Sequence, residues 1–353
     1  MYRLEVEQYP IAQSLFAGLV DVHLSVGAVL AGATPGRIWV DNRESPRVGF
    51  AVTPEGEYLN GDASHRACFA SLRRIIPRNA YLTVHPESWP SVLGEVWSNS
   101  VARKHSRRHF TFRKQRLPNW RERISDGFEL VRVDRALLNR TELKNYAEVV
   151  GRIGEWHSIE YFMRNGFGFC VLHKNAIVSR CIADCRIDDK CEIGVGTDID
   201  YRRRGLAVVT VSAAVEHCLA HGIRHIGWHC LSSNAGSIAV ARKTGFVKKA
   251  DYCAYSDGIP AENADDLTPA EYRRWADYYE DVAQNDIDYL LHAAVGSALS
   301  GDSERALRHL RALIDGGWAG KPQWLETTWV FTSMRDLPEF KSLVASLREK
   351  QPD

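Results

Sequence analysis

The sequence lacks several features that mark common protein classes. It has almost no charge imbalance, because 45 Lys and Arg residues stand against 44 Asp and Glu residues over 353 positions. This balance gives no support to a nucleic-acid-binding or membrane-surface protein. The N-terminus, MYRLEVEQYP, is charged and has no apolar core region, so it does not resemble a secretion signal. The early apolar stretch 11–33 is interrupted by polar residues, which argues against a membrane span there.

Cysteine pairs with CxxC spacing are also absent. The chain has eight cysteines, and Cys181, Cys185 and Cys191 are close in sequence, but no histidine completes a familiar zinc spacing. Without a secretion signal, the thiols are expected to be reduced and packed in the core of a cytoplasmic protein. The sequence therefore predicts no metal site.

Two familiar nucleotide-binding loops are missing as well. The stretch GVGTDI begins like the dinucleotide fingerprint GxGxxG but lacks its third glycine, and the phosphate loop GxxxxGK[ST] does not occur. The sequence therefore supports neither a dinucleotide site of that kind nor a nucleotide site built on a phosphate loop.

Periodicity divides the chain into three regions. Residues 1–125 predict a small α/β domain with strand candidates GRIWVDN, RVGFAVTP and AYLTVH and a helix over HRACFASLRRII. Residues 126–258 predict a second α/β domain. Its runs GFGFCVLHK, AIVSRCIADCRI and KCEIGVGT read as three sequential antiparallel strands, followed by a helix over GLAVVTVSAAVEHCLAHG.

Residues 259–353 predict an all-helical domain. Thr268 to Glu271 combine a capping box with proline at the first helical position. The helical segments IDYLLHAAVGSAL and ERALRHLRALI are joined by a short turn at Gly301, and a last helix follows Pro338. This arrangement resembles one tetratricopeptide helix pair with a cap, although a single pair shows no repeat period.

The strongest basic run, RKHSRRHFTFRKQR at 103–116, permits two interpretations. It is either an exposed strand with Phe110 and Phe112 facing inward and the cations facing water, or a patch for nucleic acid or a CoA-type phosphate. The first is favoured, because no nucleic-acid-binding module accompanies the run.

The segment TDIDYRRRGLA follows a predicted strand and opens a predicted helix. The first turn of a helix has backbone N–H groups without intrahelical partners and carries partial positive charge, so it binds phosphate well. Gly205 lacks a Cβ, which allows an anion to approach the backbone closely, and the preceding arginines add attraction.

This segment fits the pattern [QR]-x-x-G-x-[GA] from Arg202 to Ala207, and here the chain resembles the GNAT acyltransferase superfamily. WHCLSSNAGSIAVARKTGF resembles the second half of the GNAT core, at the expected distance. The order of GRIWVDN, GEYLNGD, GFELVRVD, SIEYFMRNGFGFC and EIGVGT is similar to a bacterial subfamily with a degenerate GNAT-like half before the active one. The resemblance covers roughly residues 25–255.

The resemblance implies the fold and the cofactor. It implies an α/β (α+β) fold, with a mixed sheet flanked by helices, a smaller GNAT-like half before it and a helical tail after it. The implied acyl donor is acetyl-CoA. Residues expected to hold its pyrophosphate are Arg202, Arg203, Arg204, Gly205, Leu206 and Ala207. Val195 and Thr197 are expected to pair with the pantetheine arm, Asn234 to contact it from the neighbouring strand, and Ser237 either to touch CoA or to make a helix-start hydrogen bond.

Catalytic roles also follow from the resemblance. Glu192, on the strand before the loop, is the candidate general base, with Asp184 in reserve. Many GNAT enzymes have a tyrosine acid four residues before the Gly-Phe pair, where this chain has Ala241, so Tyr252 is the candidate general acid and Tyr255 a substitute. For His225 and His229 a core role is favoured over catalysis.

Two functions from different classes remain. The first is an acetyl-CoA-dependent N-acetyltransferase that acetylates a small-molecule or peptide amine by direct attack. The second is an acyl-CoA sensor with little turnover, in which the C-terminal helices hold a protein partner; the departure at Ala241 motivates it. A nucleic-acid binder using residues 103–116 is a third and weaker alternative. Neither a nucleic-acid nor a membrane partner is expected.

Overall fold

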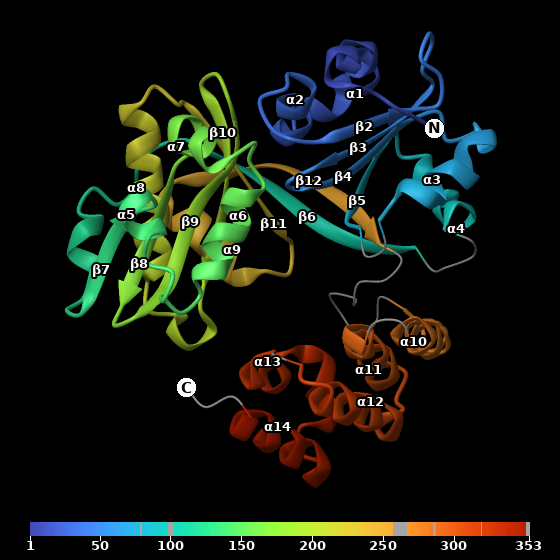
Figure 1. Cartoon of the computed structure of the whole chain (residues 1–353), viewed down its shortest axis with the longest axis vertical. Helices are drawn as coiled ribbons and strands as arrows, with labels where there is room; N and C mark the ends of the chain where they lie inside the picture. The colour runs from blue at the N-terminus through green and yellow to red at the C-terminus, as the bar shows by residue number, and fades with distance from the viewer. Residues whose placement is uncertain (78–79, 98–101, 257–266, 285–286, 319, 351–353) are drawn as a thin grey trace. The chain divides into compact units, whose positions relative to one another are not determined.

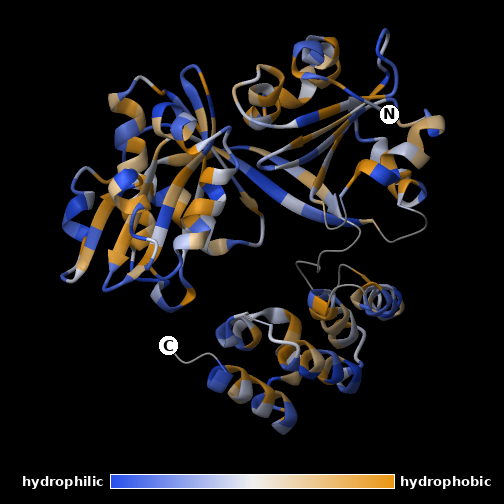
Figure 2. Ribbon diagram, viewed as in Figure 1, coloured by the Kyte–Doolittle hydropathy of each residue, from blue (hydrophilic) through white to orange (hydrophobic). Residues whose placement is uncertain are grey.

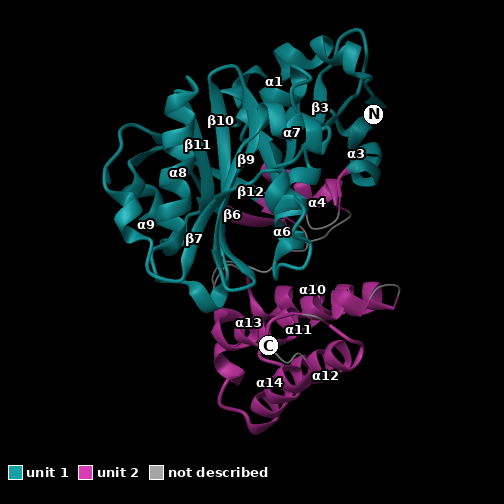
Figure 3. Ribbon diagram, turned by 60° about the vertical axis from the view of Figure 1, so that its left-hand side comes forward, with its two compact units in different colours: residues 1–75, 81–89, 106–254 teal, residues 76–80, 90–105, 255–353 magenta. Residues whose placement is uncertain are grey.

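A computed structural model of the chain describes residues 1–77, 80–97, 102–256, 267–284, 287–318 and 320–350 (Figure 1). The chain divides into two compact units (Figure 3). The first unit comprises residues 1–75, 81–89 and 106–254, and the second comprises residues 76–80, 90–105 and 255–353. The boundary expected near residue 125 falls inside the first unit, which contains most of both predicted α/β regions.

A mixed sheet forms the centre of the first unit, as the sequence predicts. The order of its strands is β1-β2-β3-β4-β5-β12-β6-β11-β10-β9-β8-β7. The strands are β1 (Tyr2–Arg3), β2 (Arg37–Val40), β3 (Val48–Thr53), β4 (Gly56–Gly61), β5 (Leu82–His85), β6 (Arg103–Phe112), β7 (Phe128–Arg132), β8 (Gly168–His173), β9 (Ala176–Ile187), β10 (Lys190–Thr197), β11 (His225–Leu231) and β12 (Phe246–Ser256). Because β12 and β6 join the two α/β regions edge to edge, one sheet serves both.

The N-terminal half of the first unit builds its own small core. Its helices are α1 (Gln13–Val20), α2 (Leu24–Leu30) and α3 (Phe69–Ile75). Buried Phe16, Val26 and Val29 pack on Ile38 of β2. Contacts also join α2 to β9 and β10, so this half covers part of the sheet contributed by the second half.

The second half supplies the larger core of the unit. The predicted antiparallel succession of β8, β9 and β10 is confirmed. The helices are α5 (Arg135–Leu138), α6 (Tyr146–Gly154), α7 (Ile159–Asn165), α8 (Leu206–Ala220) and α9 (Ala235–Thr244). Val211, Ala214, Val215 and Cys218 of α8 are buried, in agreement with the apolar face read from the sequence.

Residues 103–112 of the basic run form the central strand β6, so the expected exposure holds for Lys104, Arg113, Lys114 and Arg116 but is wrong for Arg103. Phe110 and Phe112 are buried as predicted, but Arg103, His105 and His109 are buried too. The strand lies between β12 and β11 in the sheet, so both of its edges are paired. The Arg103 guanidinium lies 4.7 Å from the centre of the Trp275 ring, which replaces water as its neighbour.

The second unit is mostly helical, and Figure 2 shows polar and apolar residues alternating around its helices. The helices are α4 (Leu93–Val96), α10 (Pro269–Ala283), α11 (Leu290–Leu299), α12 (Ser303–Asp315), α13 (Pro322–Thr327) and α14 (Pro338–Lys350). The capping box at Thr268 and Glu271 is confirmed, as is the short turn at Gly301, whose φ is 87°. The predicted apolar face of α14 is buried, whereas α13 was not predicted.

Seven of the eight cysteines are buried free thiols, which agrees with the expected core role. Among the described residues, no helix combines the length and apolar character that crossing a bilayer requires.

Candidate active site

Two neighbouring strands separate at the middle of the sheet. Parallel pairing of β10 with β11 covers Lys190 to Glu192 on one strand and His225 to Gly227 on the other. Further along, β11 pairs only with β6 on its other side, while β10 continues to Thr197 along β9. The backbone of residues 193–197 therefore faces an opening on the β11 side, at the place where the pantetheine arm is expected.

The loop after β10 leads directly into the N-terminus of α8. Gly205 precedes the helix with a φ of 82°, and a Cβ built on it would meet no atom within 4 Å. Its carbonyl accepts from the N–H groups of Val208 and Val209, at 3.0 and 3.3 Å. In the described part of the chain, no acceptor meets the backbone N–H groups of residues 203–207. Such unpaired N–H groups at a helix start are able to bind an anion, and the predicted pyrophosphate site at this loop stays a prediction.

The three arginines before Gly205 differ in what they contact. Arg202 Nε donates to the Thr197 carbonyl at 3.5 Å, and Arg204 lies over the Tyr201 ring at 5.1 Å. Arg203 has a φ of 62°, and within the described residues its side chain makes no hydrogen bond, ion pair or ring contact. Arg202 and Arg204 therefore fix the loop, and Arg203 leaves its guanidinium exposed to solvent.

The remaining predicted CoA residues lie around the opening. Val195 and Thr197 are partly exposed on β10, and Thr197 Oγ1 lies 3.0 Å from Ser179 Oγ. Asn234 is exposed and caps α9, because its Oδ1 accepts from the Ser237 N–H at 2.9 Å. Ser237 Oγ accepts from Trp228 Nε1 at 3.0 Å, so this serine has a structural partner at the helix start.

Glu192 lies where the two strands separate, and it is only 2% exposed. Its Oε1 accepts from the Leu24 N–H at 3.0 Å, and its Oε2 accepts from the Ser25 N–H at 3.3 Å, so the carboxylate caps helix α2. The Cys185 thiol also lies 3.7 Å from Oε2, and a Glu55 carboxyl oxygen lies within 4.8 Å of a Glu192 carboxyl oxygen. Every lone pair of this carboxylate thus has a neighbour.

His229 joins the two predicted catalytic residues, a role that the sequence did not indicate. Its Nε2 lies 3.0 Å from Glu192 Oε1, and its Nδ1 lies 3.0 Å from the Tyr252 hydroxyl. Arg107 Nε donates to the same hydroxyl at 2.9 Å. A carboxylate only accepts, so the neutral imidazole carries its proton on Nε2 and accepts from Tyr252 at Nδ1. The result is a chain from Glu192 through His229 to Tyr252, held at its end by Arg107.

Burial sets the protonation states along this chain. It raises the pKa of Glu192, against the lowering effect of the hydrogen bonds from Glu55, Leu24 and Ser25. It lowers the pKa of His229 to about 4, so the imidazole is neutral near pH 7. Burial also raises the pKa of Tyr252 to about 12, although Arg107 opposes the shift, so the hydroxyl keeps its proton.

Further imidazoles stack on His229. The His109 ring lies 4.4 Å away at an angle of 11°, and the His23 ring lies 5.3 Å away at 17°. The donor atoms of His109, Glu192 and His229 are close enough to one another for a metal ion. However, stacked rings direct their lone pairs along parallel planes, and the hydrogen bonds of Glu192 and His229 already use the same atoms. The cluster is therefore better described as a hydrogen-bonded network than as a metal-binding site.

A sequence profile of the GNAT acetyltransferase family matches residues 13–255, which is more than half of the chain. The chain belongs to the GNAT acetyltransferase family. A curated relative, the uncharacterized N-acetyltransferase YdfB of Bacillus subtilis strain 168, is 27% identical over 240 residues, which span 66% of this chain and 90% of YdfB. A GCN5-related N-acetyltransferase-like protein from Streptococcus suis 89/1591 has the same fold, with 24% identity, a TM-score of 0.59 and coverage of 71% of this chain and 98% of that one.

One position departs from many GNAT enzymes. Ala241, where those enzymes have a tyrosine, is fully buried in the core beneath α9. The reserve base Asp184 is 7% exposed, and its Oδ1 lies 3.1 Å from Arg152 Nη2. Burial and the charge of Glu55 raise the pKa of Asp184 well above its usual range. It is an inward-facing partner of Arg152.

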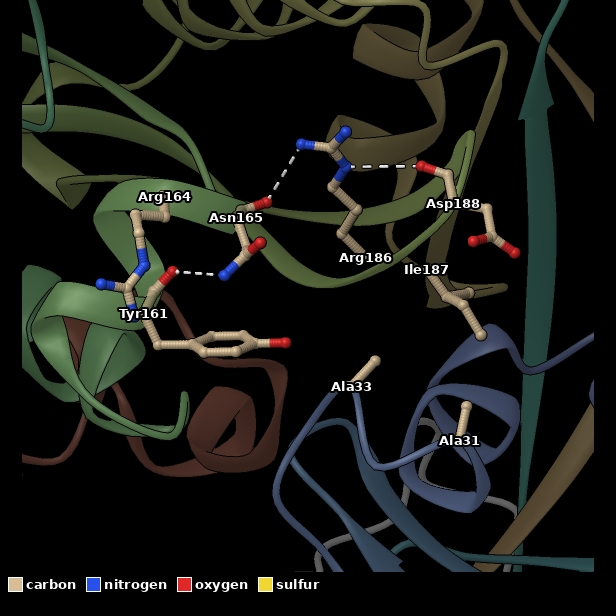
Figure 4. Close-up of a pocket in the computed structure, with 8 residues that line it drawn as sticks. All are labelled: Ala31, Ala33, Tyr161, Arg164, Asn165, Arg186, Ile187 and Asp188. Atoms are coloured by element: carbon tan, nitrogen blue, oxygen red, sulfur yellow. Dashed lines mark hydrogen bonds between the residues drawn. The ribbon is translucent and has the colours of Figure 1, made fainter.

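A cavity of about 580 Å³ lies away from these residues (Figure 4). Its lining consists of Ala31, Ala33, Tyr161, Arg164, Asn165, Arg186, Ile187 and Asp188. The Arg186 guanidinium donates to the backbone carbonyls of Asn165 and Asp188, at 3.3 and 3.5 Å. These two bonds hold the guanidinium against the wall of the cavity. None of the predicted GNAT site residues lines this cavity.

Proposed function

We propose that this GNAT protein uses acetyl-CoA to acetylate the amine of a small molecule or a peptide, by direct attack of the amine on the thioester. One observation carries the proposal. The opening between β10 and β11 runs from the chain Glu192–His229–Tyr252 to the uncapped N-terminus of α8. A site for proton transfer and a site for an anion thus lie at the two ends of one strand.

The residues around the opening have separate tasks in binding. The backbone amides from Arg203 to Ala207 hold the pyrophosphate, because they meet no acceptor among the residues that the structure describes and lie at the positive end of α8. Val195 and Thr197 pair with the pantetheine arm along the free edge of β10. The amide near Val195 polarises the thioester carbonyl as an oxyanion donor. Asn234 contacts the arm through its amide nitrogen, since its oxygen is used in the helix cap.

The hydrogen-bonded chain supplies the proton chemistry. The acceptor amine is protonated near neutral pH and must lose a proton before it attacks, so the site needs a basic carboxylate, and the carboxyls of Glu192 and Glu55 lie together at one end of this chain. Tyr252 retains its proton and gives it to the leaving thiolate, and Arg107 stabilises the phenolate that remains. No acyl-enzyme is formed, because the amine attacks the thioester itself.

Calorimetry and a thiol-release assay test the proposal together. The purified chain is titrated with coenzyme A, and release of free thiol from acetyl-CoA is then followed over a panel of small amines and peptides. We expect binding heat and turnover with at least one amine. Coenzyme A binding without turnover on any acceptor would favour the sensor hypothesis, and absence of binding would contradict both.

The role of the C-terminal helices stays a prediction. A protein partner on these helices was inferred from their tetratricopeptide-like sequence, and no contact in the described residues identifies such a partner. The enzyme hypothesis does not require one.

A further inference from the structure

Glu192 is poorly placed to meet a substrate amine. It is 2% exposed, and Leu24, Ser25 and His229 all donate to its two oxygens. A general base must come within hydrogen-bond reach of the proton that it removes. An ammonium group would reach Glu192 only by displacing the N-terminus of α2, whose two N–H groups would then lose their acceptor.

Glu55 has the access that Glu192 lacks. It lies in the turn between β3 and β4 of the N-terminal half, it is partly exposed, and one of its carboxyl oxygens lies within 4.8 Å of a Glu192 carboxyl oxygen. Glu192 lies at the last paired position before β10 and β11 separate, and the Glu55 carboxyl lies beside it there. No local pattern indicates this contact, since 137 positions separate the two residues along the chain.

The turn that carries Glu55 is fixed by polar contacts. The Glu55 N–H donates to Thr53 Oγ1 at 3.2 Å, and Thr53 Oγ1 donates to the Gly56 carbonyl at 3.1 Å. Thr53 Oγ1 also lies 3.3 Å from Ser25 Oγ, which in turn lies 3.2 Å from the Tyr58 hydroxyl. The turn is thereby tied to the helix that Glu192 caps, so the two carboxyls are held in one geometry.

The charged and titratable groups around Glu55 come from several elements. They are Glu192 on β10, Asp184 on β9, His229 on β11, Arg152 on α6 and Tyr58 on β4. Burial and the charge of Glu192 raise the pKa of Glu55 well above its usual range, while Arg152 opposes the shift. A base works best when its pKa lies near the working pH, and three carboxyls close together attract a cationic acceptor.

We propose that Glu55, from the N-terminal half, is the general base that takes the proton from the acceptor ammonium, and that Glu192 positions it. The proposal rests on the acetyltransferase function proposed above. The ammonium N–H bond breaks and its proton forms an O–H bond on the Glu55 carboxylate, which leaves a neutral amine. The amine then attacks the thioester, and the C–S bond breaks. The amide loses a second proton, and the leaving thiolate gains one, so the charges balance. Glu55 returns the first proton to solvent.

The test compares Glu55→Gln with Glu57→Gln, which removes the same charge two residues away on β4. Glu57 makes no contact with Glu192 among the described residues and bonds the Tyr81 backbone instead. Thiol release is measured across the pH range with the amine that the wild-type chain turns over best. In the wild-type chain kcat/KM should rise with pH through the Glu55 ionisation, because the base must be deprotonated. In Glu55→Gln kcat/KM should fall about 100-fold and lose this acidic limb, while Glu57→Gln should keep both.

Two further measurements separate chemistry from folding. Coenzyme A titration should give the same Kd for both variants, since neither residue lies in the predicted CoA loop. In Glu55→Ala, added formate or acetate should restore part of the rate, which a purely structural role would not allow. An unchanged pH profile in Glu55→Gln, or absence of rescue, would overturn this inference and leave the proposed function in place. Absence of turnover by the wild-type chain on any amine would overturn both.

Discussion

Helices α2 and α8 of the first unit both begin without a side-chain cap of their own, and they differ in what meets their N–H groups. At α2, the N–H groups of Leu24 and Ser25 donate to the Glu192 carboxylate, which comes from a distant strand. At α8, the corresponding groups of Leu206 and Ala207 have no acceptor in the described part of the chain. The first end neutralises a buried charge of the protein, and the second remains available to an anion from solution.

The comparison shows how one physical feature serves two purposes. At both ends the first N–H groups have no acceptor within their own helix, and both are the positive end of a helix dipole. Because the α2 end is buried, the Glu192 carboxylate stabilises the fold. Separating this charge from its N–H donors would leave both buried without a partner, which is costly. Exposure of Gly205 and the arginines before it leaves the α8 end in water, where an anion exchanges freely.

The largest effect is expected from breaking the occupied end. Glu192→Ala leaves two buried N–H groups and His229 without an acceptor, and should lower the free energy of unfolding by about 3 kcal/mol. Glu160→Ala is the control, since Glu160 is exposed in the first turn of α7, whose cap is Ser158. Urea unfolding of both variants measures the difference. Equal stability of the two would show that the cap of α2 contributes little.

Blocking the open end should have a slightly smaller effect on binding. Gly205→Glu puts a carboxylate at the predicted pyrophosphate position and should weaken coenzyme A binding about 100-fold, or about 2.7 kcal/mol. Gly222→Glu is the matched control, because Gly222 ends the same helix with a φ of 74° and also has open space around its Cβ. Both variants bear the same backbone strain, so calorimetry should separate them. Unchanged affinity in Gly205→Glu would remove the anion site.

The Tyr252 hydroxyl ends the hydrogen-bonded chain from Glu192 through His229, and its loss should lower turnover. Tyr252→Phe removes the proton donor and the acceptor of Arg107, and should lower kcat about tenfold while leaving the Kd for coenzyme A unchanged. Steady-state thiol release gives the first quantity and calorimetry the second. A full rate in this variant would assign the acid role to solvent.

The stacked imidazoles beneath α2 should make stability depend on pH. Burial lowers the pKa of His229 to about 4 and that of His109 to about 3, from 6.5 in an unfolded chain. At these two histidines the unfolded chain binds more protons between pH 6.5 and about 4, so their contribution to stability should fall as pH falls through this window. The slope is about 1.4 kcal/mol per pH unit for each histidine. His109→Phe keeps the stacked ring, and thermal unfolding over this range should show a shallower slope; an identical slope would mean that His109 does not contribute.

The smallest effect should come from the arginines at the open end. Arg203 has no side-chain contact among the described residues, so Arg203→Ala should weaken coenzyme A binding about threefold without changing stability. Arg204→Ala removes the contact with the Tyr201 ring and should loosen the loop as well. Calorimetry at two salt concentrations measures both, since screening reduces the contribution of an exposed cation. No loss in Arg203→Ala would leave the backbone amides as the whole of the site.

Much of the fold was predictable from local patterns. The antiparallel succession β8, β9 and β10, the start of α8 after Gly205 and the capping box at Thr268 all depend on residues a few positions apart. The basic run 103–116 was misjudged for the opposite reason. Charge density in sequence predicts exposure, but β12 and β11 cover this strand from both sides, and aromatic rings in the second unit surround Arg103.

The candidate site also has parts that local sequence patterns predicted and parts that depend on long-range contacts. The sequence by itself determined the strand, loop and helix that carry the proposed anion site, because glycine geometry and helix-end donors are properties of neighbouring residues. Only the tertiary structure decided that Glu192 caps α2, 168 positions away, and that Arg107 meets Tyr252 across 145 positions. These contacts arise from the order in which strands join one sheet and from the helix packed on its face. No local periodicity encodes that order, and so the proton-transfer network emerged only from the packed fold.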